Sequence, residues 1–446
     1  MNARTTLLAL STALILTTGT WVAPLSSARS SLAQEGNVTF ELGTPVASFP
    51  RGIIFPVSAT SDEEIAEVEL LYRPQFQETW SLSTPDITPG TEIALEHPID
   101  LRSGSLPVGV DVEYQWQVTQ ADGDVIQSEI GSVPWVDTRF TWDTISSDKV
   151  IVSSYNGNPE FNQKVLESAD ATIADLEAQL GITISHPIDI WVYSNGSDFD
   201  GALAPNSEPW IAGAAYSNLG LIQAVIPTGD VQELERVVPH EISHQVLYQA
   251  TDNPFNGPPS WFDEGLASVV QIGGQREYWM RLQDAAAAGI LDDIESLNGQ
   301  FPYDPNLALL AYAESLSIVT YITDTYGEDG LSKLIAAFGE GITYEDAVLQ
   351  ALGVTLDELN TAWQAQVGEQ AQNQLSGVAG PVIPTDNFPE GGWLLASGTL
   401  AIGIAVIVSL IFGRRRRASD DEAEDEPTEW NSSRGRLADA WDPTAL

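Results

Sequence analysis

The sequence predicts a multidomain chain: an N-terminal all-β sandwich, then an α+β domain with a helical C-terminal half, then one transmembrane helix. Three observations predict this order. Short alternating runs separated by turns fill residues 34–142, and mixed strand-like and helical runs fill 143–372. An uncharged apolar stretch of 20 residues occupies 393–412. At 446 residues the chain is longer than one ordinary domain, which agrees with several units.

The β-rich region contains about seven strand-like runs, among them "IIFPVSAT" (53–60) and "IAEVELLYR" (65–73). The segment "QADGDV" (120–125) places Asp-Gly between alternating runs, which is a strong signal for a β-hairpin. This density of short strands is typical of an immunoglobulin-like or fibronectin-like sandwich. The sequence of this region contains no motif of catalytic or metal-binding residues. His97 is followed by a proline, so we expect it in a surface loop.

The region that follows alternates strands and helices before it becomes helical. "KVIVSSY" (149–155) and "IDIWVYSN" (188–195) predict strands, and residues 158–181 between them predict an amphipathic helix that ends at Gly181. "GAAYSNLGLIQAVIP" (213–227) predicts a further pair of strands. Nearly everything after Asp230 has helical periodicity. A small mixed sheet followed by helices is an α+β plan.

The two ends of the chain carry signals for membrane targeting. Residues 1–33 combine Arg4, an apolar stretch and small residues at the end, which indicates a cleaved secretory signal; an uncleaved anchor is the alternative. A Pro- and Gly-rich linker (373–392) precedes the apolar span 393–412, which is long enough to cross a bilayer. Four arginines follow, so we expect the acidic tail 413–446 in the cytoplasm and the rest outside.

The charge of the chain is strongly negative. Between Gln34 and Gly392 there are 54 acidic and 10 basic residues, a net charge near −44. This argues against nucleic acid or anionic lipid as a partner, because both bind through basic patches. A salt-rich habitat and an ordinary acidic secreted surface both explain it. The absence of cysteine excludes disulfides, thiolate metal sites and a cysteine nucleophile.

The stretch "VVPHEISHQVL" (237–247) contains two of the four histidines. His240 and His244 are four residues apart, so on a helix they lie on one face and their imidazoles can converge on one ion. Glu241 lies one position round the helix and can reach a water on that ion. Pro239 either kinks this helix or marks its start. The structural alternative is a helix whose histidines cap or pair with local carboxylates.

A catalytic zinc usually takes three protein ligands, so a third is needed. "PPSWFDEGLASVV" (258–270) offers it. Ser260 is a candidate N-cap of a new helix, and Asp263 is placed to complete a capping box. Glu264 lies in the first turns of that helix, and an antiparallel return after a short loop brings it back to the first helix. Asp263 can instead orient a ligand histidine from behind.

"HEISH" followed by "WFDEGLA" resembles the gluzincin branch of metallopeptidases, and most closely the bacterial peptidase MA-like group. The resemblance covers about residues 145–370 and implies a thermolysin-like fold. It implies that His240, His244 and Glu264 hold one zinc ion per chain and that Glu241 is the general base. We then expect a peptide or protein as the substrate, and the terminal segments predict a membrane-anchored member of the group that works outside the cell.

Two further features bear on activity. In gluzincin aminopeptidases a tyrosine on a later helix stabilises the oxyanion, and Tyr312 is the candidate here, with core packing as the alternative. Those enzymes also carry a glutamate on a strand before the zinc helix. "GAAYSN" (213–218) has no acidic residue, which favours endopeptidase action. Two other functions remain as alternatives to an enzyme. One is a degenerate gluzincin domain that serves as a binding or scaffold module, and the other is a surface adhesion protein that works through its β-sandwich.

Overall fold

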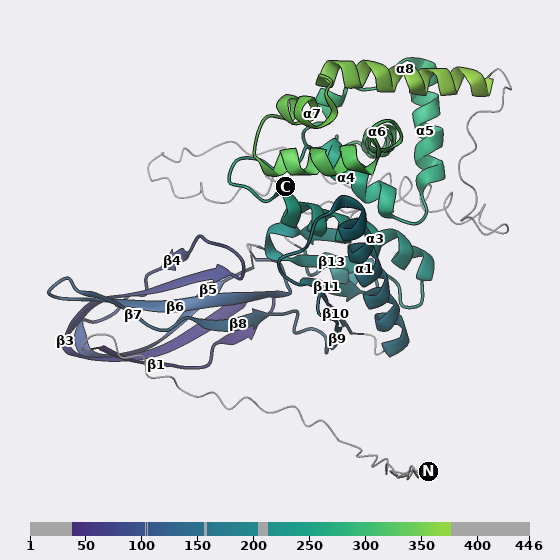
Figure 1. Cartoon of the computed structure of the whole chain (residues 1–446). Coiled ribbons are helices and arrows are strands. Elements are labelled where there is room, and N and C mark those ends of the chain that lie inside the picture. The colour runs from purple at the N-terminus through teal and green to yellow at the C-terminus, as the bar shows by residue number, and fades with distance from the viewer. Residues whose placement is uncertain (1–37, 103, 105, 156–157, 204–212, 376–446) are drawn as a thin grey trace, which may run out of the picture. The chain divides into compact units, whose positions relative to one another are not determined.

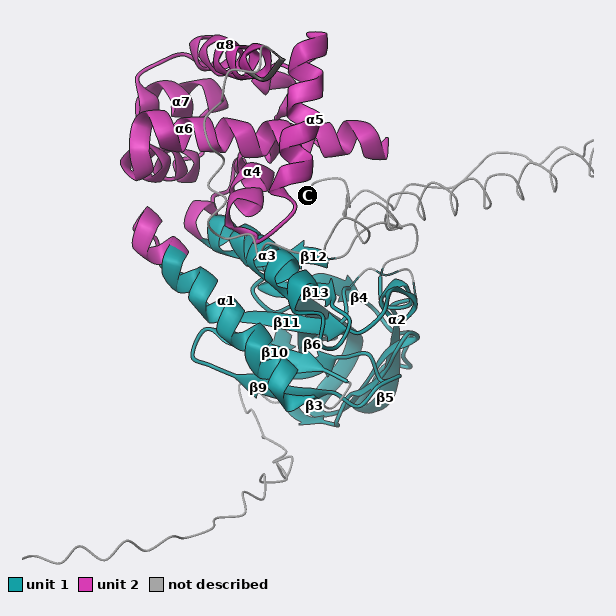
Figure 2. Cartoon of the chain, turned by 90° about the vertical axis from the view of Figure 1, so that its right-hand side faces the viewer, with its two compact units in different colours: residues 1–175, 183–249 teal, residues 176–182, 250–446 magenta. Residues whose placement is uncertain are grey.

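The computed structural model describes residues 38–375 except 103, 105, 156–157 and 204–212. These residues form two compact units (Figure 2). Unit 1 comprises the described residues up to Asp175 together with Thr183–Gln249, and unit 2 comprises Leu176–Ile182 and the described residues from Ala250 onward. Unit 1 contains two β-sheets and unit 2 is helical (Figures 1 and 2).

The first sheet confirms an N-terminal β region. Its strands are antiparallel, and the long strand β3 lies at its centre (Figure 1). β3 pairs directly with β1, β2, β4, β5 and β6. The strands are β1 (Val38–Leu42), β2 (Val46–Ser48), β3 (Gly52–Pro74), β4 (Ser81–Ser83), β5 (Gly90–Asp100), β6 (Val110–Gln120), β7 (Val125–Gln127) and β8 (Gly131–Trp135). β6 and β7 form the hairpin that Asp122-Gly123 predicts, and Gly123 has a φ of 95°.

β3 is one strand where the sequence predicts two runs. Its first part, Gly52–Thr60, pairs with β5, its last part pairs with β6, and the register shifts between Thr60 and Ile65. The sheet therefore folds over at this point. Phe55 and Tyr114, which are not paired in register, bring their ring centroids within 5.1 Å. Alternate residues of β6 are buried in the core between the folded halves.

His97 does not lie in a loop, contrary to the sequence expectation. It belongs to β5 and pairs with Phe55 of β3. Its Nε2 lies 2.7 Å from Oγ of Ser83, and partial burial lowers the pKa of the imidazole. Pro98 misled the prediction. Among the described strands β5 pairs only with β3, and an edge strand tolerates proline.

The second sheet is mixed and has five strands in the order β12-β13-β11-β10-β9. They are β9 (Asp143–Ser146), β10 (Val150–Ser154), β11 (Ile188–Tyr193), β12 (Gly213–Tyr216) and β13 (Leu221–Val225). β10, β11 and β13 run parallel, while β9 and β12 are antiparallel edges. Helix α1 (Pro159–Leu180) covers one face, where Val192 lines a small pocket with Phe161. As predicted, α1 stops at Gly181, which has a φ of 68°.

Unit 1 also contains the short helix α2 (Gly196–Asp200), the 3-10 turn η1 (Ser217–Leu219) and most of helix α3 (Val231–Thr251). The opposite face of the second sheet packs on the first sheet. Leu221 of β13 belongs to the buried core of the first sheet, and Trp191 of β11 packs against that core. The two sheets of unit 1 therefore share one hydrophobic core.

Unit 2 confirms the helical C-terminal half. Its elements are α4 (Ser260–Val270), α5 (Gln275–Ala288), η2 (Ile294–Leu297), α6 (Pro305–Gly339), α7 (Tyr344–Leu352) and α8 (Leu356–Leu375). α4 and α6 approach closely because Gly265 has no side chain: a Cβ there would lie 2.5 Å from the carbonyl oxygen of Ser315. The predicted capping box at Ser260 is wrong. Pro259 is the N-cap of α4, and no side chain caps this end.

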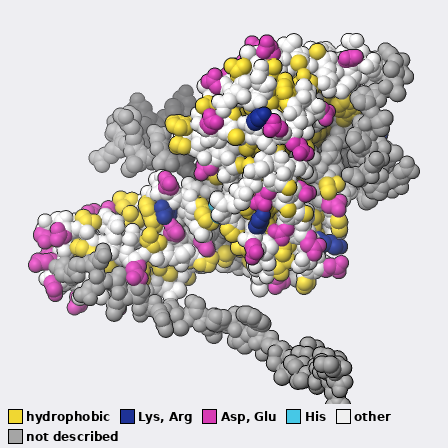
Figure 3. All heavy atoms as spheres, in the orientation of Figure 1, with side chains coloured by type: hydrophobic (Ala, Val, Ile, Leu, Met, Phe, Trp, Pro, Cys, Tyr) yellow, Lys and Arg dark blue, Asp and Glu magenta, His cyan; other side chains and the backbone are white. Residues whose placement is uncertain are grey.

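The predicted signal (1–33), apolar span (393–412) and tail (413–446) lie outside the described residues. Among the described helices none combines the length and the apolar character needed to cross a bilayer. On the face drawn in Figure 3, acidic side chains are scattered widely and lysine and arginine are sparse.

Candidate metal centre

The histidine helix is one continuous element. α3 runs through Pro239, so the helix does not begin there. His240 and His244 are half-buried, and their ring centroids lie 4.9 Å apart. The i, i+4 spacing therefore places both imidazoles on one face, as predicted.

Two glutamines attach α3 to the second sheet and to the segment that leads into β11. Nε2 of the buried Gln245 donates to the carbonyl oxygen of Leu221 at 2.8 Å. Oε1 of Gln249 accepts from the backbone N–H groups of Ser185 at 2.7 Å and His186 at 3.1 Å. These contacts set the rotation of the helix about its own axis. They therefore determine where the two histidines point.

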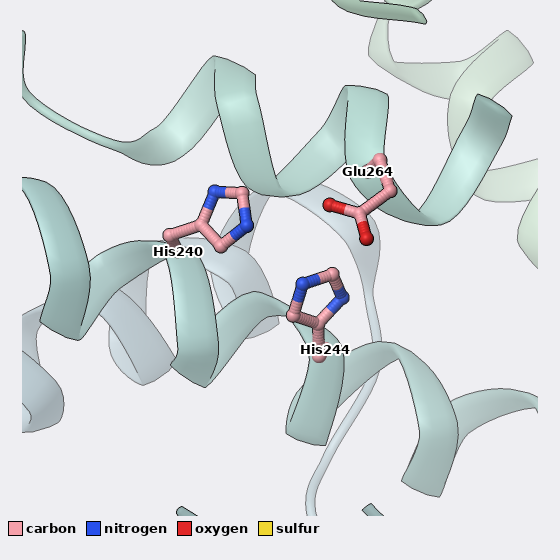
Figure 4. Close-up of side chains that lie close together, drawn as sticks. All are labelled: His240, His244 and Glu264. Carbon is pink, nitrogen blue, oxygen red and sulfur yellow. The ribbon is translucent and has the colours of Figure 1, made fainter. Parts of the chain in front are cut away.

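The structure brings the three predicted ligands together (Figure 4). One donor atom from each of His240, His244 and Glu264 can be chosen so that all three lie within 4.8 Å of one another. All three side chains are half-buried. Glu264 comes from α4, and its neighbour Asp263 is not a member of the group.

The donor set fits zinc. Two imidazole nitrogens and one carboxylate oxygen are the ligand types of a catalytic zinc site, and three protein donors leave a fourth position open. Around a tetrahedral zinc, bond lengths of about 2.0–2.1 Å place the donors about 3.4 Å apart. Donors within 4.8 Å of one another need only small side-chain movements to reach that spacing.

Glu241 faces the edge of the second sheet. Its side chain is buried, with an exposed fraction of 9%. A Cβ built on Gly213 of β12 would lie 2.7 Å from the carboxyl carbon of Glu241 and closer still to one of its oxygens. A side chain at position 213 would therefore displace the carboxylate from this place. The candidate base thus lies directly beside a strand that pairs, among the described strands, with β13 alone.

Tyr312 lies on α6 in an aromatic group of unit 2. Its ring lies parallel to that of Tyr278, with centroids 6.3 Å apart, and edge-on to Phe301 at 5.2 Å. The side chain is half-buried. These contacts fix the plane of the phenol. The contacts agree with both roles that the sequence suggests for Tyr312: a hydroxyl that stabilises the oxyanion, or a residue that packs in the core.

Sequence reasoning missed the residues that support the site. Gln245 and Gln249 continue the buried stripe of Val238 and Ile242 along α3, and polar residues in an apolar stripe were the available signal. Gly213 carried no signal, because its role depends on a contact 28 positions along the chain. Apart from these supporting residues, the buried carboxyl of Glu314 in α6 accepts from the backbone N–H of Asp292 at 2.9 Å, and burial raises its pKa to about 8.

The helix with His-Glu-x-x-His and the following helix with a third, acidic donor form the residue pattern of the gluzincin class of metallopeptidases. Residues 168–369, a little under half of the chain, match the model of the Peptidase MA superfamily. The match includes all five candidate residues and leaves out the first sheet. The family resemblance read from the sequence is therefore confirmed.

Comparison with solved structures adds little. Wild-type OgpA from Akkermansia muciniphila is 16% identical, with a TM-score of 0.19, over 24% of this chain and 30% of that one. Catalytically inactive OgpA from the same organism, in complex with the O-glycopeptide substrate glycodrosocin, is 15% identical, with a TM-score of 0.19, over 25% and 32%. A Br derivative of BhCBM56 is 11% identical, with a TM-score of 0.16, over 23% of this chain and 97% of that one.

Scores this low support no argument about fold or function. The match spans less than a third of the OgpA chain. No curated protein matches the sequence.

Proposed function

We propose that this chain hydrolyses peptide bonds with the help of one zinc ion held by His240, His244 and Glu264. The observation that carries the proposal is the convergence of these three donors, with a buried glutamate one residue beyond the first of them. The match of residues 168–369 to the model of the Peptidase MA superfamily supports the same reaction class. When bound at this site, zinc supplies a Lewis acid that acidifies water and polarises a carbonyl group.

Glu241 is the proton carrier in this proposal. It is beside the ligands in the chain but is not one of them, so its carboxylate is left to accept a proton from the attacking water. It then returns that proton to the leaving amine. Burial beside β12 keeps the carboxylate away from bulk water and holds it where a bound peptide would pass.

Tyr312 is proposed to donate its hydroxyl hydrogen to the carbonyl oxygen as negative charge develops there. Its contacts with Tyr278 and Phe301 hold the phenol ring in one plane. Replacing Tyr312 with phenylalanine keeps both ring contacts and removes only the hydroxyl. A large loss in kcat with little change in KM would support the role.

The edge strand β12 is proposed to bind the substrate backbone. An extended peptide can add to a free sheet edge through main-chain hydrogen bonds. β12 runs Gly-Ala-Ala-Tyr and carries no acidic side chain that could hold a free amine. We therefore propose endopeptidase action. Small side chains on this strand also leave space for substrate side chains.

The proposed location follows from the terminal segments. The predicted secretory signal at 1–33 and the predicted apolar span at 393–412 support a location in which the catalytic part is outside the cell, held by one helix, with the acidic tail in the cytoplasm. The sparse basic charge argues against nucleic acid as a partner.

The first test is hydrolysis of a peptide library by the full-length chain, with and without a chelator. The second test compares the kcat of wild type with that of Glu241→Gln on a peptide that wild type cleaves, at equal zinc content. Glutamine keeps the size of the side chain but accepts no proton, so kcat should fall by about 10² to 10⁴. Equal rates would exclude Glu241 as the base. If wild type binds zinc but cleaves no peptide, the domain is a zinc-holding scaffold instead.

A further inference from the structure

A short turn leaves the first sheet directly after β3. It comprises residues 75–77, called the β3 turn here. The backbone N–H of Gln75 donates to the carbonyl oxygen of Asp111 at 2.8 Å, which ties the turn to the first sheet. Phe76 has a φ of 70°, a left-handed conformation that a bulky residue rarely adopts. Its ring is 45% exposed, so burial in the first sheet does not explain that conformation.

Gln77 of the β3 turn reaches the segment that follows β12. Its Nε2 donates to the carbonyl oxygen of Asn218 at 2.7 Å. Asn218 lies in η1, which joins the edge strand β12 to β13. On either side of it, Tyr216 and Leu219 pack against the core of the first sheet. The C-terminal end of β12 is therefore held by the first sheet as well as by β13.

Phe76 reaches the histidine helix through one intermediate. Its ring stacks on the imidazole of His186, with centroids 4.4 Å apart and planes inclined by 17°. The backbone N–H and carbonyl of His186 both bond to Gln249 of α3, at 3.1 and 3.3 Å. Gln249 is five residues beyond His244. A chain of direct contacts thus leads from the β3 turn to the helix that carries the metal-binding histidines.

The first and second sheets also pack closely at Val108 and Gly109, the residues directly before β6. Nε2 of the fully buried Gln223 in β13 donates to the carbonyl oxygen of Val108 at 2.6 Å. A Cβ on Gly109 would lie 2.7 Å from Cδ1 of Trp191 and 2.9 Å from Leu221. Gln223 is also paired in register with Ala214 of β12.

We propose that the β3 turn is a positioning element for the candidate active site. Gln77 fixes β12, Phe76 fixes α3 through His186, and together they set the distance between the edge strand and Glu241. Phe76 and Gln77 are then positioning residues, and the first sheet is a structural part of the catalytic unit. The effect on hydrolysis rests on the proposed function, whereas the effect on β12 and α3 does not.

The test uses the full-length chain and three variants. Gln77→Glu keeps the side-chain size and removes the donor. Phe76→Gly removes the ring and suits the positive φ, so the fold is not strained further. Val125→Ala is the control, because Val125 is 55% exposed on β7 of the same sheet and outside these contacts. Hydrogen exchange followed by mass spectrometry reports on β12 and α3 without any need for activity.

We expect Gln77→Glu to speed exchange in residues 213–219 by about fivefold, and Phe76→Gly to do so in residues 183–187 and the last turn of α3, since each loses one ordered contact. Val125→Ala should match wild type. In hydrolysis, Gln77→Glu should raise KM more than it lowers kcat, and Phe76→Gly should lower kcat and weaken zinc binding. Unchanged exchange in both segments of folded variants overturns the proposal.

The two proposals fail separately. If the exchange rates change as expected but wild type cleaves no peptide, the positioning role stands and the peptidase function fails. If wild type cleaves peptides and both variants match it in exchange, kcat and KM, the peptidase function stands and the positioning role fails.

Discussion

Gly213→Ala tests the geometry of the candidate base with one methyl group. The added Cβ would lie 2.7 Å from the carboxyl carbon of Glu241 and closer still to Oε1, whereas ordinary contacts begin at 3.4 Å, so the carboxylate must retreat by about 1 Å. The end of a flexible side chain can move that far without unfolding the protein. A misplacement of about 1 Å at a reacting group can cost about 10²-fold in rate, so we expect kcat to fall by about 10- to 100-fold.

The assay measures kcat and KM for Gly213→Ala on a peptide that wild type cleaves, together with zinc content and Tm. The matched control is Gly196→Ala, because a Cβ at Gly196 meets nothing within 4 Å. Zinc content should not change, since Gly213 faces Glu241 and not a ligand. A variant with wild-type kcat and KM at equal zinc content would refute the placement of Glu241 beside β12.

Three further outcomes are expected. Replacing His240, His244 or Glu264 with alanine should in each case lower zinc occupancy, since two protein donors hold zinc far less tightly than three. Asp263→Ala should keep full zinc occupancy, as measured by metal analysis of the purified variants. If Asp263→Ala lost zinc and Glu264→Ala kept it, the third ligand would be Asp263. Burial, and then the charge of a neighbouring aspartate, raise the pKa of Asp189 to about 6, so ionised Asp189 destabilises the fold and stability is lost as pH rises from about 4 to above 6. Asp189→Asn should therefore stabilise the protein by about 1 kcal/mol more at pH 8 than at pH 5 in denaturant titrations, and a gain independent of pH would contradict this. The Tm should rise from low to molar monovalent salt because screening relieves repulsion among the acidic groups, whereas a flat or falling trend would mean that they are too far apart to interact.

Local signals in the sequence predicted most single elements. The end of α1 at Gly181, the hairpin at Asp122-Gly123 and the pair β12–β13 all follow from neighbouring residues. β3 was read as two strands because exposed acidic residues at 62–64 interrupt its alternation where the strand changes partner. Periodicity reports burial, and it cannot show that hydrogen bonding continues through an exposed bend.

The site divides in the same way. The spacing within α3 was enough to predict that His240 and His244 share one face, and the following motif pointed to Glu264. The contacts that orient α3 join residues far apart in the chain, such as Gln245 with Leu221. A single sequence carries no record of such pairs, so the support of the site emerged only from the fold.

Among the described strands β12 pairs only with β13, and its other edge has a consequence for how the protein behaves at high concentration. A strand that can accept a peptide backbone can also accept the same strand of a second molecule, which is a route to aggregation. β12 is only four residues long and has no charged side chain of its own to prevent this. The large negative charge of the chain keeps molecules apart instead. Concentrated salt should therefore make the protein more resistant to heat and, at the same time, more prone to self-association.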